Sequence, residues 1–125
     1  MRVAVTTGYS YWGRWHPSDA LDPPTPHRSP TQIAGGETAM LWLSTGLAQA
    51  GHQVGLFYDT ARPVLYRGVQ YLPTTYKLPE LLSRRYDVLI SWEDIESLAV
   101  NHGAAVTIHA IQCNIMAMGI IDYGV

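Results

Sequence analysis

Residues 35–58 read GGETAMLWLSTGLAQAGHQVGLFY, and within this stretch a pattern typical of a helix gives way to one typical of a strand. The helical part carries one apolar stripe with spacings of three and four residues, formed by Met40, Leu43, Leu47 and Ala50. Gly51 follows directly, and glycine is the residue that most often ends a helix. Residues 53–58 then form an apolar run that predicts a buried strand. A helix that leads straight into a buried strand indicates an α/β fold.

The rest of the chain continues this alternation. The sequence predicts further strands at 2–7, 64–72, 87–91 and 104–109, and further helices at 78–85 and 94–101. Strands that alternate with helices predict a Rossmann-like, mostly parallel, doubly wound sheet with helices on both faces. Right-handed crossovers favour the strand order 3-2-1-4-5. In that order the first strand lies beside the fourth, and ligands bind at the carboxyl ends of the strands near that point.

Residues 9–33 differ from the rest because they hold five of the eight prolines. Proline at this density predicts a long loop with neither a regular helix nor a central strand. The loop also holds Tyr11, Trp12 and Trp15, whereas disordered linkers are usually poor in aromatic residues. These rings could stack on a sugar, or they could pack on one another as a small core of the loop.

Length and composition predict one globular domain over residues 1–125, with 47% hydrophobic and 14% charged residues. The formal net charge of −2 gives no electrostatic reason to expect nucleic acid or an anionic membrane as a partner. Cys113 is the single cysteine, so no intrachain disulfide is possible, and its surroundings suggest a passive thiol. A cytoplasmic location without a transmembrane segment is expected. Because no closing helix follows the last predicted strand, the domain is expected to be truncated.

Candidate site residues occur at two places along the predicted ligand edge. Gly35, Gly36 and Glu37 stand just before the predicted helix, where glycines let a ligand approach the backbone and helix N–H groups favour a phosphate. They could equally be a loop that leads into a helix, with Glu37 matched to the helix dipole. His109 ends a predicted strand at the same edge, and it could be either a site residue or a hydrogen-bonded strand terminus.

The sequence gives little support for other kinds of functional motif. The acidic residues Glu93, Asp94 and Glu96 fit a helix start, where negative charge is stabilised. No His or Cys cluster has metal-ligand spacing, so neither a metal site nor a bound cofactor is predicted. Neither a G-x-G-x-x-G fingerprint nor a phosphate-binding G-x-x-x-x-G-K-[ST] loop is present. This argues against an epimerase- or dehydrogenase-type domain and against a P-loop nucleotidase.

Several of these segments together resemble one enzyme family, the retaining glycosyltransferase family 4. The sequences that carry the resemblance are Ile33-Ala34-Gly35-Gly36-Glu37, Leu47-Ala48-Gln49-Ala50-Gly51-His52-Gln53-Val54, Tyr86-Asp87-Val88-Leu89-Ile90-Ser91 and Ala105-Val106-Thr107-Ile108-His109. They match the family's glycine pair and glutamate, its L-A-x-x-G-H-x-V run, and two later strands. The resemblance implies a GT-B fold, in which two Rossmann-like halves face each other across the active site. This chain would be the N-terminal, acceptor-side half.

The resemblance also implies roles for individual residues. Gly35 and Gly36, with Glu37, would approach the diphosphate and sugar of a nucleotide-sugar donor, and His109 would contact the transferred sugar. Tyr11, Trp12, Trp15 and Trp92 would lie toward a hydroxyl acceptor. Ser91 stands where the family often has histidine, and the family's donor-binding E-x7-E motif is not found in this chain.

Two function classes follow. The first is the N-terminal half of a hexosyltransferase-type glycosyltransferase that transfers a sugar with retention, inactive alone, and partnered by a C-terminal domain or by self-association. The second is a stand-alone, non-catalytic Rossmann-like binding or interaction domain.

Overall fold

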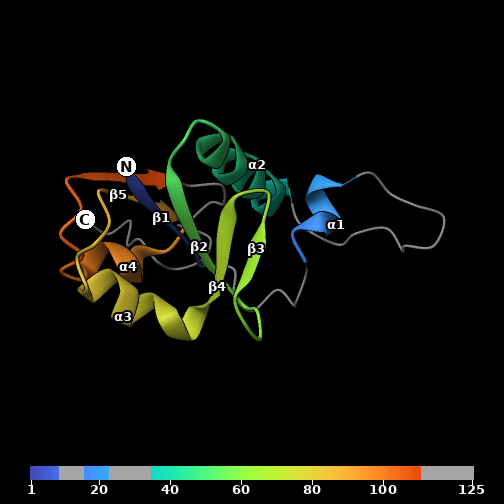
Figure 1. Ribbon diagram of the computed structural model, residues 1–125. Helices are drawn as coiled ribbons and strands as arrows, with labels where there is room; N and C mark the ends of the chain where they lie inside the picture. Colours follow the sequence, from blue (N-terminus) through green and yellow to red (C-terminus); the bar gives the residue numbers. More distant parts are fainter. Residues whose placement is uncertain (9–15, 23–34, 111–125) are drawn as a thin grey trace, which may run out of the picture.

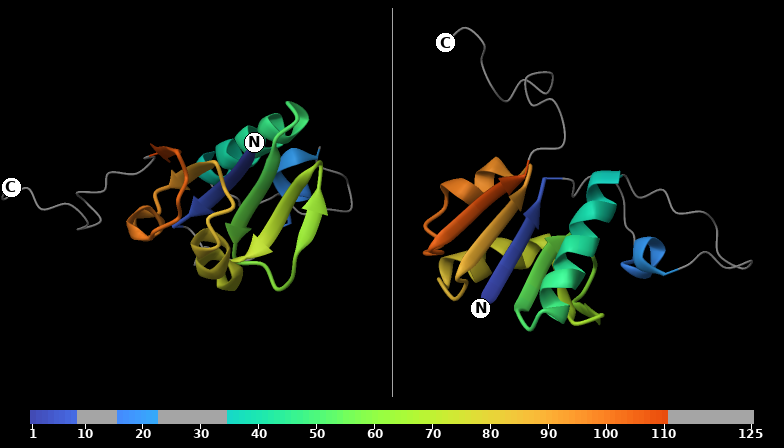
Figure 2. Two further views of the ribbon diagram at one scale, coloured as in Figure 1. Left: turned by 60° about the vertical axis from the view of Figure 1, so that its left-hand side comes forward. Right: turned by 90° about the horizontal axis from the view of Figure 1, so that it is seen from above.

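The computed structural model describes residues 1–8, 16–22 and 35–110, with residues 35–37 described by their backbone alone. They form one six-stranded sheet with helices on both faces (Figures 1 and 2). The strands are β1 (Arg2–Thr7), β2 (Gln53–Tyr58), β3 (Val64–Tyr66), β4 (Val69–Pro73), β5 (Val88–Trp92) and β6 (Val106–Ala110). The helices are α1 (Ser18–Leu21), α2 (Gly35–Gln49), the 3-10 turn η1 (Thr74–Tyr76), α3 (Lys77–Leu82) and α4 (Ile95–Ala99). None of these helices is both long and apolar enough to cross a bilayer.

The strand order is β3-β4-β2-β1-β5-β6, which differs from the predicted five-strand order 3-2-1-4-5. All neighbours are parallel except β3 and β4, which are antiparallel. The predicted third strand at 64–72 is therefore wrong, because it is a hairpin. Arg67 and Gly68 both have positive φ, at 48° and 83°, and two such residues in succession reverse the chain in a tight hairpin turn. The sheet gains an antiparallel edge strand as a result.

Two layers of apolar side chains cover the sheet, and they follow the alternation of the strands. Val3 and Val5 of β1 face the layer under α2, while Ala4 faces the layer under α3 and α4. Figure 2 shows α2 on one face of the sheet and the two shorter helices on the other. Each face of the central strands is therefore buried, as expected for a parallel sheet.

The buried face of α2 differs from the predicted stripe. Met40 and Leu41 are fully buried, whereas Leu43 is 41% exposed. Ser44 and Thr45 take the neighbouring buried positions. Their hydroxyls donate to the carbonyls of Met40 and Leu41 at 2.8 Å, so these polar groups are satisfied within the helix and can be buried. The prediction used hydrophobicity alone, so the predicted buried stripe is displaced by about one residue from the face of α2 that is buried.

The predicted loop at 9–33 contains a helix, so the expectation of no helix there is wrong. Helix α1 begins after its N-cap residue, Pro17. Proline has no backbone N–H, and at the start of a helix that N–H would have no partner inside the helix. Leu21 is buried in the layer under α2. Asp22 then accepts hydrogen bonds from Tyr66 and from Arg67, the latter at 2.6 Å, which fixes α1 to the hairpin.

Candidate functional site

Three parallel strands, β1, β5 and β6, end together at the edge where the sequence predicts a site. The amide of Gly8 donates to the Trp92 carbonyl at 3.1 Å, and the amide of Glu93 donates to the Ala110 carbonyl at 2.9 Å. The chain connections diverge here, because β1 leads by α2 to β2 on one side and β5 leads by α4 to β6 on the other. This is the topological switch point of the sheet.

The turn after β5 passes so close to β1 that no side chain fits between them. A Cβ atom added to Gly8 would lie 2.4 Å from the Glu93 carbonyl oxygen. Glu93 itself has a φ of 55°, a conformation unusual for a residue with a side chain, and it is only 7% exposed. Backbone held in a sparsely populated conformation at a strand end is common at functional sites.

His109 lies in a row of polar side chains that crosses three strands. It pairs with Ser91 of β5, which pairs with Thr6 of β1. Because paired residues share a face, all three lie on the face covered by α3 and α4. The His109 Nε2 and Thr6 Oγ1 atoms are buried, and neither has a hydrogen-bond partner among the described residues. Buried polar atoms without partners are rare, so this row is the strongest polar feature of the edge.

Asp94 anchors the loop that follows this row. It is the N-cap of α4, as its predicted place at a helix start requires, and accepts from the Ser97 amide at 3.4 Å and from the Ser97 hydroxyl. Its backbone carbonyl accepts from Ser91 Oγ at 2.6 Å. Lys77 reaches from α3 to form an ion pair with the Asp94 carboxylate at 2.9 Å. Aspartate is a preferred N-cap residue, so the sequence signals the cap, whereas nothing in the sequence pairs Lys77 with Asp94.

The glycine pair takes a different place from the predicted one. Gly35 and Gly36 do not precede the helix but are the first residues of α2, followed by Glu37. The start of α2 lies at the same end of the sheet as the tips of β1 and β5 (Figure 2). However, α2 covers one face, and His109 lies on the other. The two parts of the predicted site therefore share an edge but stand on opposite sides of the sheet.

The aromatic candidates are only partly described. Trp92 lies at the end of β5 but is buried in the layer under α2, with 6% of its surface exposed. Its indole Nε1 is buried and has no partner among the described residues. Tyr11, Trp12 and Trp15 lie outside the described residues, as does Cys113. Trp92 therefore lies at the carboxyl edge of the sheet, but its side chain is almost completely buried.

A separate hollow lies at the amino end of β1 and β2, away from the carboxyl edge. It has a volume of about 200 Å³, and the sequence gives no motif for it. Tyr86 forms part of its wall, where burial, and after it the negative charge of Glu80, raises the tyrosine pKa to about 12. The cavity and the polar row are therefore two distinct features of the same face.

Within residues 1–8, 16–22 and 35–110, no group of three or more His, Cys, Asp and Glu side chains could hold a metal ion. Compared with known proteins, the chain matches no family model, no curated protein and no solved structure.

Proposed function

We propose that this chain is the N-terminal, acceptor-side half of a GT-B glycosyltransferase that moves a sugar from a nucleotide-sugar to a hydroxyl acceptor with retention. The observation that carries the proposal is the carboxyl edge at the switch point, where Gly8, the turn at Glu93 and the end of β6 meet. In open parallel sheets this is the edge at which ligands bind. The sequence resemblance supplies the reaction class.

His109 is the proposed contact to the transferred sugar. Its ring lies at the end of β6, and its Nε2 has no partner among the described residues, so it is available for a hydrogen bond to a hydroxyl. The Thr6 hydroxyl, two strands away in the same row, is in the same state. A sugar, which carries many hydroxyls, suits the buried Thr6 and His109 atoms that lack partners among the described residues.

The start of α2 is the proposed contact to the donor diphosphate. The first N–H groups of a helix have no partner inside the helix, and the dipole favours negative charge there. Gly35 and Gly36 add no side chains that would keep a phosphate from the backbone. Stabilising the leaving diphosphate would be an electrostatic contribution to catalysis.

A non-catalytic binding domain is the competing proposal, and one observation favours it. Among the described residues no carboxylate is hydrogen-bonded to His109, so no acid–base pair is assembled around it. Both proposals use the same edge to bind a ligand, and they differ in whether transfer follows.

The first test is a nuclear magnetic resonance titration of the chain with a panel of nucleotide-sugars. Amide shifts at Gly8, at residues 91–94 and at His109 are expected. Shifts confined to the amino end of the strands, or none with any donor, would contradict both proposals. If the chain binds a nucleotide-sugar but no sugar is transferred even when a donor-binding half is supplied, the proposal of a non-catalytic binding domain would be supported.

The second test is activity in a polypeptide that joins this chain to a donor-binding half. His109→Ala should lower turnover about 100-fold or more, in line with the loss of one transition-state hydrogen bond. His52→Ala is the matched control, because His52 lies beside the amino terminus at the opposite edge, 3.4 Å from the Met1 ammonium. Equal turnover of the two variants would remove His109 from the site.

A further inference from the structure

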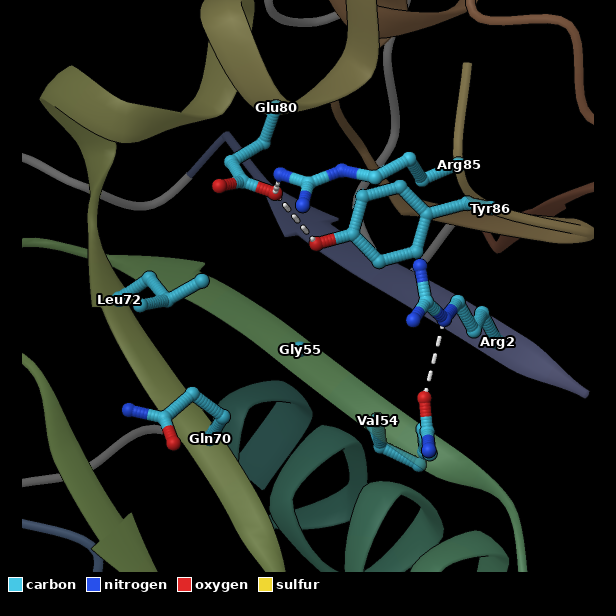
Figure 3. A pocket seen from close by; sticks show the side chains of 9 residues that line it. Arg2, Val54, Gly55, Gln70, Leu72, Glu80, Arg85 and Tyr86 are labelled. Carbon is cyan, nitrogen blue, oxygen red and sulfur yellow. Dashed lines mark hydrogen bonds and ion pairs between the residues drawn. The ribbon is translucent and has the colours of Figure 1, made fainter. Parts of the chain in front are cut away.

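Most of the residues that line the hollow at the amino end of the sheet have polar side chains. Figure 3 shows its lining around the β2 strand, with Tyr86 and Arg2 on one side and Gln70 and Leu72 on the other. The lining residues are Arg2, Gln53, Val54, Gly55, Gln70, Leu72, Glu80, Arg85 and Tyr86. Its volume of about 200 Å³ lies below the roughly 300 Å³ at which pockets for drug-sized ligands begin, so it suits a small molecule.

The local sequence explains why this part of the sheet is open. Gly55 lies in the floor and has no side chain, and a Cβ atom there would be 3.2 Å from the Tyr86 hydroxyl. The helix α3 has only six residues, and its buried Leu81 packs over Ala4 and Phe57. Of the six residues of α3, only Glu80 lines the hollow over the amino half of β1 and β2.

The charges of the lining leave one cation without a carboxylate partner. Glu80 is held by Arg85 at 2.9 Å, and it also accepts from the Tyr86 hydroxyl at 3.2 Å. Arg2 donates through Nε to the Gln53 amide oxygen at 3.0 Å. The two terminal nitrogens of the Arg2 guanidinium have no hydrogen-bond partner among the described residues. The carboxylate of Asp87 is bonded to the Arg2 backbone amide at 2.8 Å rather than to its side chain.

Glutamine side chains supply further donors beside Arg2. The Gln70 amide is half-buried and has no hydrogen-bond partner in the described part of the chain. Gln70 pairs across the sheet with Gly55, so it stands directly beside the floor of the hollow. The side-chain NH₂ of Gln53 is also left for a ligand, since its oxygen is used by Arg2.

We propose that this hollow binds a small molecule bearing an oxyanion, a carboxylate or a phosphate, which Arg2 anchors and Gln53 and Gln70 orient. A guanidinium fork with two terminal nitrogens to spare matches the geometry of both groups. The ligand meets one uncompensated positive charge, because Arg85 neutralises Glu80. This site is independent of the carboxyl edge, and its failure would leave the proposed glycosyltransferase role untouched.

The test is a nuclear magnetic resonance titration of the whole chain with inorganic phosphate and, separately, with acetate, at constant ionic strength. Saturable shifts at the amides of Gly55 and Gln70 are expected with at least one anion. Tighter binding of phosphate would indicate a phosphate monoester as the natural ligand, and tighter binding of acetate a carboxylate. Shifts that do not saturate with either anion would overturn the proposal.

Two substitutions and a control locate the site. Arg2→Gln should weaken binding about tenfold, since it removes the charge-assisted bonds. Arg62→Gln removes an equal charge from an exposed loop far from the lining and should change nothing. Gln70→Glu keeps the side-chain size while adding a repelling charge, and it should also weaken binding. An equal loss in the Arg62 variant, or no loss in either lining variant, would show general attraction to the protein charge.

Discussion

The rings of Phe57 and Tyr86 meet edge to face, with their centroids 6.4 Å apart and their planes inclined by 79°. This contact fixes Tyr86 over the sheet, so that its hydroxyl stands above Gly55 and donates to Glu80. Edge-to-face pairs contribute about 0.5–1.5 kcal/mol beyond the area that they bury. The Tyr86 part of the wall of the amino-end hollow is therefore held by core packing.

The burial of Tyr86 predicts a loss of stability at alkaline pH. Its pKa is raised from 10.0 to about 12, so between these values the unfolded chain releases a proton that the folded chain keeps. The free energy of unfolding must then fall as pH rises from 10 to 12, and the contribution is fully present below pH 10. Burial raises the pKa of Tyr58 and of Tyr71 as well, which adds to the loss with the same sign.

Urea unfolding at a series of alkaline pH values measures this loss. Tyr86→Phe should make stability fall less steeply above pH 10, because the phenylalanine ring cannot ionise. Tyr76→Phe is the control, since the Tyr76 side chain is 43% exposed on the surface of the protein. A steeper fall in the Tyr86 variant than in the parent chain would contradict the assignment.

The close approach of β1 and the Glu93 turn predicts that Gly8→Ala is strongly destabilising. The new methyl group would lie 2.4 Å from the Glu93 carbonyl oxygen, and both partners are backbone, so one strand end must shift. A loss of about 1–3 kcal/mol in the free energy of unfolding is expected, as for other overpacked positions.

Gly46→Ala is the matched control for that experiment. Gly46 lies inside α2 with nothing within 4 Å of an added Cβ atom, so alanine should stabilise the helix by about 0.5–1 kcal/mol. Opposite signs for the two glycine variants, measured by the same urea unfolding, are the expected result. Stabilisation by both would mean that the turn after β5 relaxes freely.

The cap and ion pair of Asp94 predict a second destabilised variant. Asp94→Ala removes the acceptor for the Ser97 amide and leaves Lys77, whose side chain is 18% exposed, without its carboxylate. We expect a loss of about 2–4 kcal/mol, combining a lost cap with a broken, mostly buried pair. Glu96→Ala, an exposed change in the same helix turn, should alter stability by less than about 0.5 kcal/mol.

The outer edge of β6 predicts self-association. Val106 and Ile108 are 49% and 48% exposed there, and edge strands with apolar side chains tend to pair with other strands. Light scattering at rising concentration should show species larger than the 13.9 kDa monomer. Ile108→Lys should remove them, whereas Leu65→Lys on the opposite edge strand should not. A chain that stays monomeric throughout would show that this edge is protected.

The sequence predicted the parallel core of this fold because its signals are local. A buried apolar run at 53–58 and the run at 87–91 each identify a central strand. The hairpin at Arg67 was missed because arginine rarely adopts a positive φ, so a single glycine resembled an interruption in one strand. The helix α1 was missed for another reason, because its four residues are held by a long-range contact between Asp22 and Arg67 of the hairpin.

The candidate site was harder to predict than the fold. The end of a predicted strand placed His109 at the carboxyl edge, because topology alone fixes that position. Which face each side chain occupies depends on register, and a shift of one residue reverses it. The Lys77 ion pair and the amino-end hollow depend on contacts between segments far apart in the chain, and no local pattern encodes them.

The position of β1 in the middle of the sheet has a consequence for how the chain acquires its structure during synthesis. Arg2 contacts Gln53 across 51 positions and Asp87 across 85 positions. At about 5–20 residues per second, a ribosome needs on the order of 4–17 s to make the chain between Arg2 and Asp87. Because β1 precedes both of its neighbours in the chain, it must wait for them, and such non-local pairing slows folding. Until β5 is made, the apolar residues of β1 lack one of the two strands that flank them in the finished sheet.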